Sequence, residues 1–361
     1  MMYKHIEDKS YKHLVCIIIG GSEHENHLHG LAHVGEHMCL LPYFEGDKED
    51  KTYSTYGYTC IDHALLYFTS QDEDSLKTIR AMIENKSIVR KDRVEIAKHQ
   101  VICECSSLND EIVKKETVVK FVTENKIRNF AAGKVKDIDQ ITVQDVWKWL
   151  DCIIAENRIF FFFLEDLTSD VIDTQIMIRN KTKFFNNRET SIQILYLCEY
   201  IKEVCDLDIY IPLEPIFEKK DYLQLIIGEN YLENYLSSFF EIVEVTEKYF
   251  SYQERYVLIS AKNIQFNKIP IIVTKLRDIS KQDISNSYLS NKTKLYEQLL
   301  ELEKEYVADN RSILNSLIRK LVYGVPVLNI GEDIALTKVT KNRLSEELIK
   351  SLKSKIKIIV K

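Results

Sequence analysis

Hydrophobic and polar positions at the start of the chain fall into patterns that predict a strand, a helix and a second strand. Residues 13–21 form a β-branched run that closes on a Gly-Gly pair, which is typical of a buried strand. Residues 28–41 carry apolar side chains three and four positions apart, the spacing of one helix face. Residues 56–70 are expected to continue as strand.

The following segments predict mainly helices before another strand. Thr142 and Asp145 have the spacing of a relaxed capping box, so a helix is expected to begin there, and Gly133 is expected to stop the preceding helix. Residues 158–164 contain four consecutive phenylalanines and predict a fully buried strand. The expected helices cover residues 74–86, 90–107, 114–132 and 142–154.

The second half of the chain ends in the same order of elements as the first. Gly324 precedes a helix expected from Thr340 to Leu352, and residues 356–360 read as the closing strand. This order indicates an internal duplication of about 180 to 200 residues, a period too long for a solenoid. Strands and helices are mixed without a regular βαβ rhythm, which favours the α+β class.

The predicted organisation is therefore two homologous domains, each a mainly antiparallel sheet with helices packed on one face. Residues 168–190 are polar and irregular, and we expect them to link the domains. A strand at residues 191–197 then restarts the pattern. The expected N-terminal domain covers residues 1–167, and the C-terminal domain covers residues 191–361.

Composition narrows the possible partners and location. The formal net charge is −6, with 49 Lys and Arg scattered among 55 Asp and Glu, so nucleic acid is not an expected partner. No apolar run approaches the roughly 20 residues that a membrane helix needs, so no membrane span is expected. The N-terminus lacks an apolar signal core, and eight cysteines occur without a Cys-x-x-Cys pair. These features indicate reduced thiols and a cytoplasmic protein.

All nine histidines lie within the first 99 residues, so a histidine-based site belongs to the first half. The helix predicted at residues 28–41 contains His33-Val-Gly-Glu36-His37, an H-x-x-E-H pattern. On a helix His33 and His37 share one face, where two imidazoles can bind one Zn²⁺. Glu36 lies at the edge of that face and can act as general base toward a zinc-bound water. A catalytic zinc also needs a third protein ligand from elsewhere.

The residues around this pattern resemble the opening signature of the pitrilysin, insulin-degrading enzyme and mitochondrial processing peptidase family. Gly-Gly-Ser-Glu-His-Glu at residues 20–25 and Gly-Leu-Ala-His-Val-Gly-Glu-His-Met at residues 30–38 carry the resemblance. Residues 56–68 match the next strand of the family in part, with Gly57 for a small Ala and Ala64 for a second Thr. The resemblance implies a zinc endopeptidase with one Zn²⁺ per chain.

In this family the strand after the helix is an exposed edge on which the substrate lies as an added strand. The resemblance therefore implies that Gly57, Tyr58 and Thr59 bind the substrate. His63 lies beside the expected site and is a candidate for lining the groove.

The resemblance also implies the third metal ligand. Lys-His-Gln-Val-Ile-Cys-Glu at residues 98–104 matches the family pattern, which makes Glu104 the expected ligand. A second family acid falls on Ala97, so its support for the site is missing or has moved to Glu95. A thiolate from Cys39 or Cys60 in place of Glu104 would make the site structural rather than hydrolytic.

The second half departs from the family pattern. Family members that supply it carry an Arg and a Tyr there, which hold the substrate and the developing oxyanion. Here Val243 takes the Arg place, and Tyr249 is the candidate substrate-binding Tyr. Because an apolar side chain cannot polarise a carbonyl, we expect a heterodimer with a homologous partner subunit that supplies Arg and Tyr. The alternative is a homodimer that uses Tyr249 and Arg255.

The sequence thus predicts a zinc-dependent endopeptidase subunit that hydrolyses peptides or unfolded segments. Peptide maturation within a heterodimer is one use that the resemblance leaves open. The rival function is a non-catalytic peptide-binding or structural subunit on the same fold. Such members typically lose a His or the Glu of the motif, whereas this chain keeps His33, Glu36 and His37.

Overall fold

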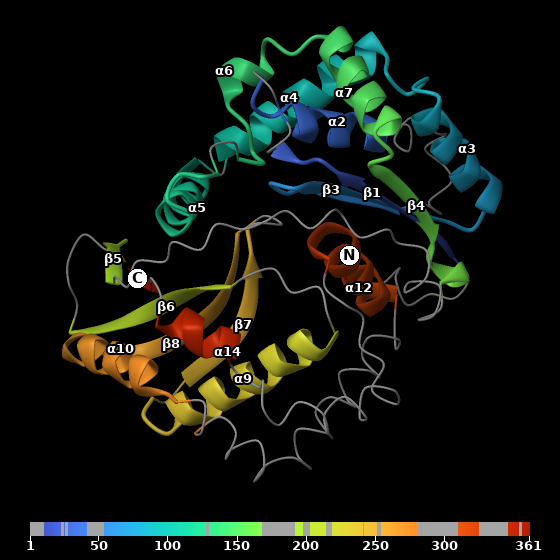
Figure 1. Cartoon of the computed structure of the whole chain (residues 1–361). Coiled ribbons are helices and arrows are strands. Elements are labelled where there is room, and N and C mark those ends of the chain that lie inside the picture. Colours follow the sequence, from blue (N-terminus) through green and yellow to red (C-terminus); the bar gives the residue numbers. More distant parts are fainter. Residues whose placement is uncertain are drawn as a thin grey trace. The chain divides into compact units, whose positions relative to one another are not determined.

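A computed structural model gives the architecture of the chain as two compact units (Figure 1). The structure describes residues 11–22, 25, 28–41, 54–107, 109–127, 130–167, 192–197, 203–213, 219–240, 242–250, 254–280, 283, 310–324, 346–353 and 356–361. Unit 1 comprises residues 1–120, 124–175 and 307–322. Unit 2 comprises residues 121–123, 176–306 and 323–361.

Unit 1 is built on an antiparallel sheet in the order β2-β3-β1-β4. Its strands are β1 (Lys12–Ile19), β2 (Ser54–Thr59), β3 (His63–Ser70) and β4 (Ile159–Phe163). The β-branched run of β1 is buried on both faces, as a central strand requires. Strand β2 lies at an edge of this sheet, which matters for the site below.

Helices cover one face of this sheet, where α2, α4 and α7 lie side by side (Figure 1). The described helices of the unit are α2 (Leu31–Leu40), α3 (Glu73–Glu84), α4 (Lys91–Ser107), α5 (Asn109–Val122), α6 (Val135–Ile138), α7 (Val143–Ala155) and α12 (Asn310–Tyr323), of which α5 and α12 end just beyond the limits of the unit. Buried side chains of α2, including Val34 and Met38, share one core with Cys16 and Ile18 of β1. Gly35 lets α2 approach α7, because a Cβ there would lie within 3.0 Å of the Trp149 ring.

Unit 2 has a five-stranded sheet in the order β5-β9-β6-β8-β7. Its strands are β5 (Ile192–Tyr196), β6 (Val204–Leu213), β7 (Ile242–Tyr249), β8 (Arg255–Gln265) and β9 (Ile356–Val360). The β5–β9 pair is parallel, and the other pairs are antiparallel. One core joins the sheet to α9 (Lys219–Ser237), α10 (Ile269–Asp278) and α14 (Glu346–Leu352), which lie on the same side of it (Figure 1).

The predicted α+β class is confirmed, and so are most of the predicted elements that the structure describes. The capping box of α7 is present, because Thr142 Oγ1 accepts from the Asp145 amide and the Asp145 carboxylate accepts from the Thr142 amide. The predicted linker, residues 168–190, lies outside the described residues. So does the predicted start of the last helix at Thr340. The predicted domain limits stay a prediction.

Three predicted elements were wrong in detail. Residues 56–70 form a hairpin, β2 and β3, rather than one strand. Strand β4 is only partly buried rather than fully buried, because it lies at the other edge of its sheet. The helix predicted to reach residue 132 ends at Val122, and Glu124 and Asn125 then take positive φ values of 55° and 61°.

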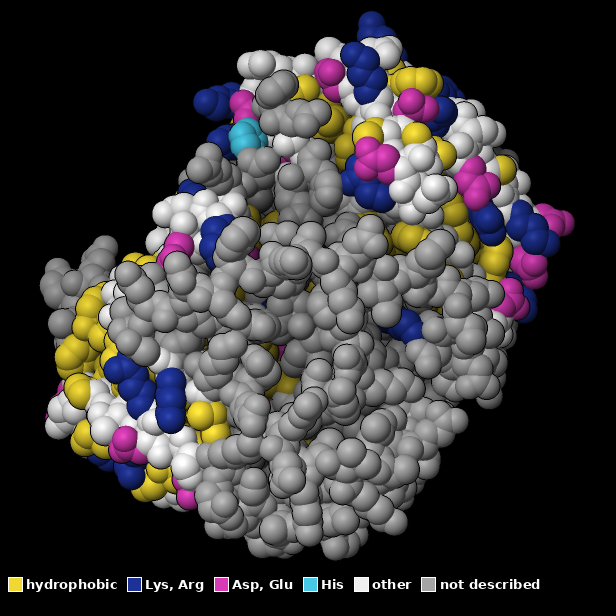
Figure 2. All heavy atoms as spheres, viewed as in Figure 1, with side chains coloured by type: hydrophobic (Ala, Val, Ile, Leu, Met, Phe, Trp, Pro, Cys, Tyr) yellow, Lys and Arg dark blue, Asp and Glu magenta, His cyan; other side chains and the backbone are white. Residues whose placement is uncertain are grey.

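Figure 2 shows Lys and Arg side chains interspersed with Asp and Glu, without a basic stripe on the described part of this face. Within the described residues, no helix has both the length and the apolar character needed to cross a membrane.

Candidate metal centre

The start of α2 is held by a buried carboxylate and by two glycines in close contact. Glu25 accepts hydrogen bonds of 2.8 Å from the backbone amides of Gly30 and Ala32. Amides at a helix N-terminus have no acceptor within the helix, and Glu25 supplies one here. Gly30 has a φ of 105° and Gly133 a φ of 78°, a region that favours glycine. A Cβ on Gly133 would fall 2.9 Å from the Gly30 nitrogen, so both positions require glycine. This arrangement fixes where α2 begins, and therefore which way its histidines point.

His33 and His37 converge on one carboxylate. His33 Nε2 lies 3.4 Å from one oxygen of Glu104, and His37 Nε2 lies 3.5 Å from the other. Both imidazole side chains are mostly buried, whereas the side chain of Glu104 is 52% exposed. The three groups come from α2 and α4, and the cluster is therefore open to solvent on the Glu104 side.

The Nδ1 atoms of both histidines have partners of their own. His33 Nδ1 lies 3.4 Å from the carbonyl oxygen of Ala132, and His37 Nδ1 lies 3.1 Å from Gln100 Oε1. A carbonyl can only accept, so the His33 bond places a proton on Nδ1, and a neutral His33 would then have the lone pair of Nε2 available for a metal. In metal sites, a hydrogen bond to the ring nitrogen that does not bind the metal orients the imidazole.

This donor set fits zinc. Ligand atoms at about 2.0–2.2 Å from a tetrahedral zinc lie roughly 3.3–3.6 Å apart, and the two nitrogen–oxygen separations to Glu104 fall in that range. His33, His37 and Glu104 could therefore hold one Zn²⁺. The assignment of the three ligands stays a prediction.

Glu36 adjoins the cluster as a buried carboxylate. Its potential ligand atom and those of His33 and His37 all lie within 4.8 Å of one another, and its Oε2 is 4.0 Å from His33 Nε2. Glu36 is 2% exposed and accepts a 3.1 Å hydrogen bond from the Thr59 hydroxyl. A Cβ on Gly57 would come within 3.0 Å of Glu36 Oε1, so the glycine makes room for this carboxylate.

Burial and charge shift the protonation of the cluster in opposite directions. Burial raises the pKa of Glu36 above its ordinary value, although the neighbouring His37 and His33 act against the rise. A hydrogen bond with His33 lowers the pKa of the Glu104 carboxyl. Burial acts to lower the pKa of His33, but Glu104 and Glu36 outweigh it and the net direction is upward. The roles predicted for Glu36 as the general base and for Glu104 as a ligand stay predictions.

Three of the predicted substrate-binding residues lie on β2, where they face in two directions. Gly57 and Thr59 face α2 and Glu36. Tyr58 projects to the opposite face by strand alternation, where its ring meets that of His63 edge-on at 5.6 Å. His63 is buried, and its Nδ1 lies 2.9 Å from Asp62 Oδ1. The roles assigned to these four residues stay predictions.

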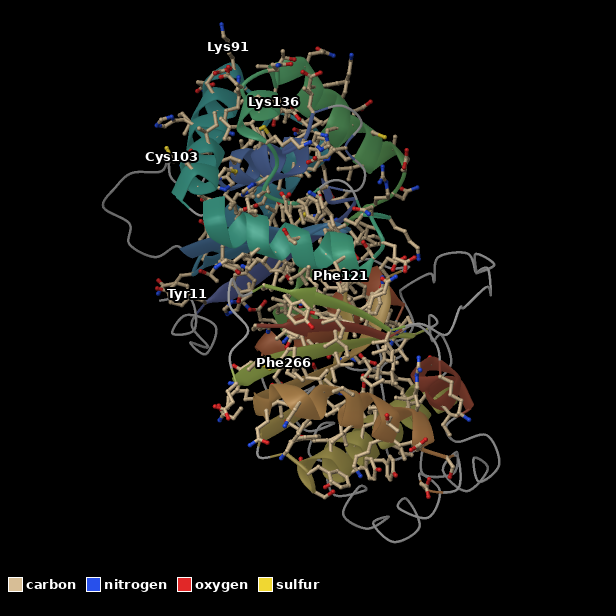
Figure 3. The ribbon with its side chains drawn as sticks, turned by 90° about the vertical axis from the view of Figure 1, so that its left-hand side faces the viewer. Tyr11, Lys91, Cys103, Phe121, Lys136 and Phe266 are labelled. Carbon is tan, nitrogen blue, oxygen red and sulfur yellow. The ribbon has the colours of Figure 1, made fainter. Side chains whose placement is uncertain are left out.

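The alternatives at the metal centre were a supporting acid at Glu95 and a thiolate ligand from Cys39 or Cys60, and the described contacts bear on Glu95 and Cys39, while Cys60 stays a prediction. Glu95 is exposed, and its carboxylate pairs with Lys98 rather than with a histidine. Ala97 is buried and has no polar group to offer. Cys39 is buried, and burial raises the pKa of its thiol to about 12, which disfavours a thiolate ligand. Figure 3 shows Cys103 on the outer side of α4, where it is exposed.

Tyr249 lies in unit 2 beside Arg255 and Glu247. Arg255 Nη2 donates to Tyr249 Oη at 2.8 Å and to Glu247 at 3.2 Å, and its guanidinium lies 4.8 Å from the centre of the Tyr249 ring. Arg255 is 2% exposed. Val243 and Tyr249 both lie on strand β7, and Arg255, the arginine beside Tyr249, lies on β8.

Sequence reasoning missed two groups of this site, Gln100 and the Ala132 carbonyl. Gln100 precedes Glu104 by one helical turn, so helix spacing alone could have placed both on the face that meets α2. The Ala132 carbonyl is a backbone atom and leaves no sequence signal. The Ala132 carbonyl also accepts a 3.0 Å hydrogen bond from the thiol of the buried Cys105, so Cys105 and His33 contact the same oxygen.

The fold is that of M16-like peptidases in solved structures. The first half of the periplasmic protease PqqL from Escherichia coli is 12% identical over 98% of this chain and 88% of that chain, with a TM-score of 0.71. The peptidase M16 inactive domain from Pseudomonas fluorescens is 12% identical over 97% of this chain and 92% of that chain, with a TM-score of 0.57. Identities this low show the fold alone.

The whole PqqL protease is 13% identical with a TM-score of 0.67, and the match covers 97% of this chain and 45% of that chain. This chain thus spans about half the length of whole PqqL. No protein-family model matches the sequence, and no curated protein matches it.

Proposed function

We propose that this chain is a zinc-dependent endopeptidase subunit of the pitrilysin type that hydrolyses peptides or unfolded segments. The observation that carries the proposal is the convergence of His33 Nε2 and His37 Nε2 on Glu104, at 3.4 and 3.5 Å, beside the buried carboxylate of Glu36. Two imidazoles and one carboxylate are a ligand set of hydrolytic zinc sites. The M16-like peptidase fold supports the same reading.

The protein groups of the site have separate tasks in peptide hydrolysis. Zn²⁺ bound by His33, His37 and Glu104 would act as a Lewis acid and make water a nucleophile near neutral pH. Glu36 accepts the proton of the attacking water and delivers it to the leaving amine nitrogen. Burial favours this task, because it raises the pKa of Glu36 toward the working pH. The Thr59 hydroxyl holds the carboxylate of Glu36 in place.

The edge of the sheet supports a peptide as the substrate. Strand β2 lies at the edge of its sheet, and the backbone groups of an edge strand can pair with an added extended peptide. Gly57 and Thr59 of this strand face Glu36, so a peptide added to β2 would lie next to the proposed base. An extended substrate agrees with cleavage of unfolded segments rather than of folded domains.

The contacts of Arg255 support the proposal that an arginine for the site comes from a partner subunit. Arg255 is buried and bonded to Tyr249 and Glu247, so its charge is engaged within unit 2. Whole PqqL is about twice as long as the part that this chain matches. We propose that a homologous partner supplies the Arg/Tyr pair in a heterodimer. Tyr249 as a substrate contact belongs to the homodimer alternative, and a cytoplasmic location stays a prediction.

A non-catalytic peptide-binding subunit is the second candidate, and the inactive M16 domain from Pseudomonas fluorescens shows that the fold does not require activity. The deciding experiment incubates a mixed peptide library with the zinc-loaded chain, with and without a homologous partner subunit. Peptide cleavage that a chelator abolishes and added zinc restores is the expected result. Peptide binding without cleavage under both conditions would favour the non-catalytic subunit.

A further inference from the structure

Gln100 occupies the position from which His37 is oriented. It lies on α4, one helical turn before Glu104, so the same helix presents a metal ligand and the partner of another ligand. Gln100 Oε1 is 3.1 Å from His37 Nδ1, and this contact is partly buried. Ala97, almost one turn further back, is fully buried and offers no hydrogen bond to the site.

An amide and a carboxylate act differently at this place. A carboxylate can only accept, so it would hold the proton of His37 on Nδ1 and keep the Nε2 lone pair ready for a metal. It would also add negative charge and raise the basicity of the imidazole. An amide carries both an acceptor and a donor, so after a flip it can serve either tautomer of His37. One of those two tautomers has a proton on Nε2 and cannot bind a metal.

We propose that Gln100 is the positioning residue of His37, and that its neutral amide makes the metal more weakly held than a carboxylate would. This inference rests on the proposed zinc site. His33 differs in this respect, because its Nδ1 faces the Ala132 carbonyl, which serves a single tautomer. The metal site therefore has one histidine with a fixed tautomer and one whose tautomer depends on the side chain at position 100.

Two substitutions at this position should change the zinc affinity in opposite directions. Gln100→Leu removes the partner of His37 at similar volume, and the affinity should fall roughly 10- to 100-fold. Gln100→Glu retains the acceptor and fixes the tautomer, and the affinity should rise roughly tenfold. If Gln100 only filled space, Gln100→Leu would leave the zinc affinity unchanged. Gln100→Glu would then lower the stability of the fold without raising the zinc affinity.

The measurement is the zinc dissociation constant of the full chain, by competition with a chromophoric chelator at neutral pH. Gln144→Leu and Gln144→Glu on the exposed surface of α7 are matched controls for the change of side chain. His99→Glu places the same added charge one residue away, on the exposed side of α4, and controls for general attraction. The three controls should stay within about threefold of the wild type.

The outcomes separate this inference from the proposed function. A wild-type chain that binds no zinc overturns the zinc site itself. A wild-type chain that binds zinc, together with equal affinities of Gln100→Leu and Gln100→Glu, overturns the role of Gln100 alone. A rise in His99→Glu equal to that in Gln100→Glu shows that charge rather than the contact with His37 is responsible, and also overturns it.

Discussion

Glu36 is the residue whose chemistry the account depends on most. Its carboxylate is buried, bonded to Thr59 and close to both histidines, yet the proposed ligand set does not need it. We therefore expect Glu36→Gln to keep the fold and the zinc while peptide cleavage falls roughly 10²-fold or more, since an amide cannot accept the proton. Rates and zinc content are measured on the same preparation. Near-normal cleavage by a zinc-loaded Glu36→Gln variant would remove Glu36 from the mechanism.

A substitution at Gly57 tests whether the position of the Glu36 carboxylate matters for the rate. An added Cβ would come within 3.0 Å of Glu36 Oε1 and 2.8 Å of Leu40 Cδ1. The end of the Glu36 side chain is flexible enough to yield, so Gly57→Ala should displace the base at little cost in stability. A misplacement of about 1 Å can cost roughly 10²-fold in rate, and we expect a loss of 10- to 100-fold with unchanged zinc content. Unchanged turnover would mean that Gly57 does not position Glu36.

At the scale of elements, the N-terminus of α2 depends on the buried Glu25. Burial raises the pKa of this carboxyl from 4.5 to about 7, although its bonds to the Gly30 and Ala32 amides act against the rise. Between these two pKa values the folded chain binds more protons than the unfolded chain, so this contribution to stability falls as pH rises. We expect Glu25→Gln to remove that part of the pH dependence, on the order of 1–3 kcal/mol.

The measurement for Glu25 is the free energy of unfolding of both proteins in denaturant between pH 4.5 and 8. Glu95→Gln, on the exposed side of α4, serves as the matched control. A difference between wild type and Glu25→Gln that stays constant with pH would contradict the account of this helix start.

Hydrophobic patterning was sufficient to predict the elements that their own local sequence determines. Strand β1, helix α2 and the capping box of α7 follow from side-chain periodicity and from Thr142 and Asp145. The β2–β3 hairpin was missed because its turn, Cys60-Ile61-Asp62, has no glycine, proline or asparagine. Its geometry is set by a distant segment, since the Gly20 amide donates to the Asp62 carbonyl. Long-range contacts of this kind leave no local pattern to find.

The candidate site was predictable to a similar extent. His33, Glu36 and His37 follow from helical spacing, because all three belong to one helix. Glu104 came only from the family resemblance, since nothing in its own segment distinguishes it from other exposed acids. The contact of Gly57 with Glu36 depends on how α2 packs on β2, and packing between elements cannot be read from spacing.

At the scale of the whole molecule, the division of work between two subunits can be tested through Tyr249. Its hydroxyl is bonded to Arg255 and Glu247, so Tyr249→Phe should cost about 0.5–1.5 kcal/mol of stability. Cleavage by the mixture with a homologous partner should stay unchanged. The lone chain should be roughly 10²-fold slower than the mixture, because the oxyanion lacks its donor. Full activity of the lone chain together with its loss in Tyr249→Phe would establish the homodimer alternative instead.

The most direct test of the central claim is the zinc content of the purified chain by elemental analysis. One set of three protein ligands predicts about one zinc per chain in the wild type. Occupancy should fall in both His33→Ala and Glu104→Ala, because the Nε2 atom and the carboxylate lie 3.4 Å apart in one cluster. Full occupancy in Glu104→Ala alone would point to a different third ligand. Full zinc occupancy in His33→Ala would contradict the account, since the motif would then not hold the metal.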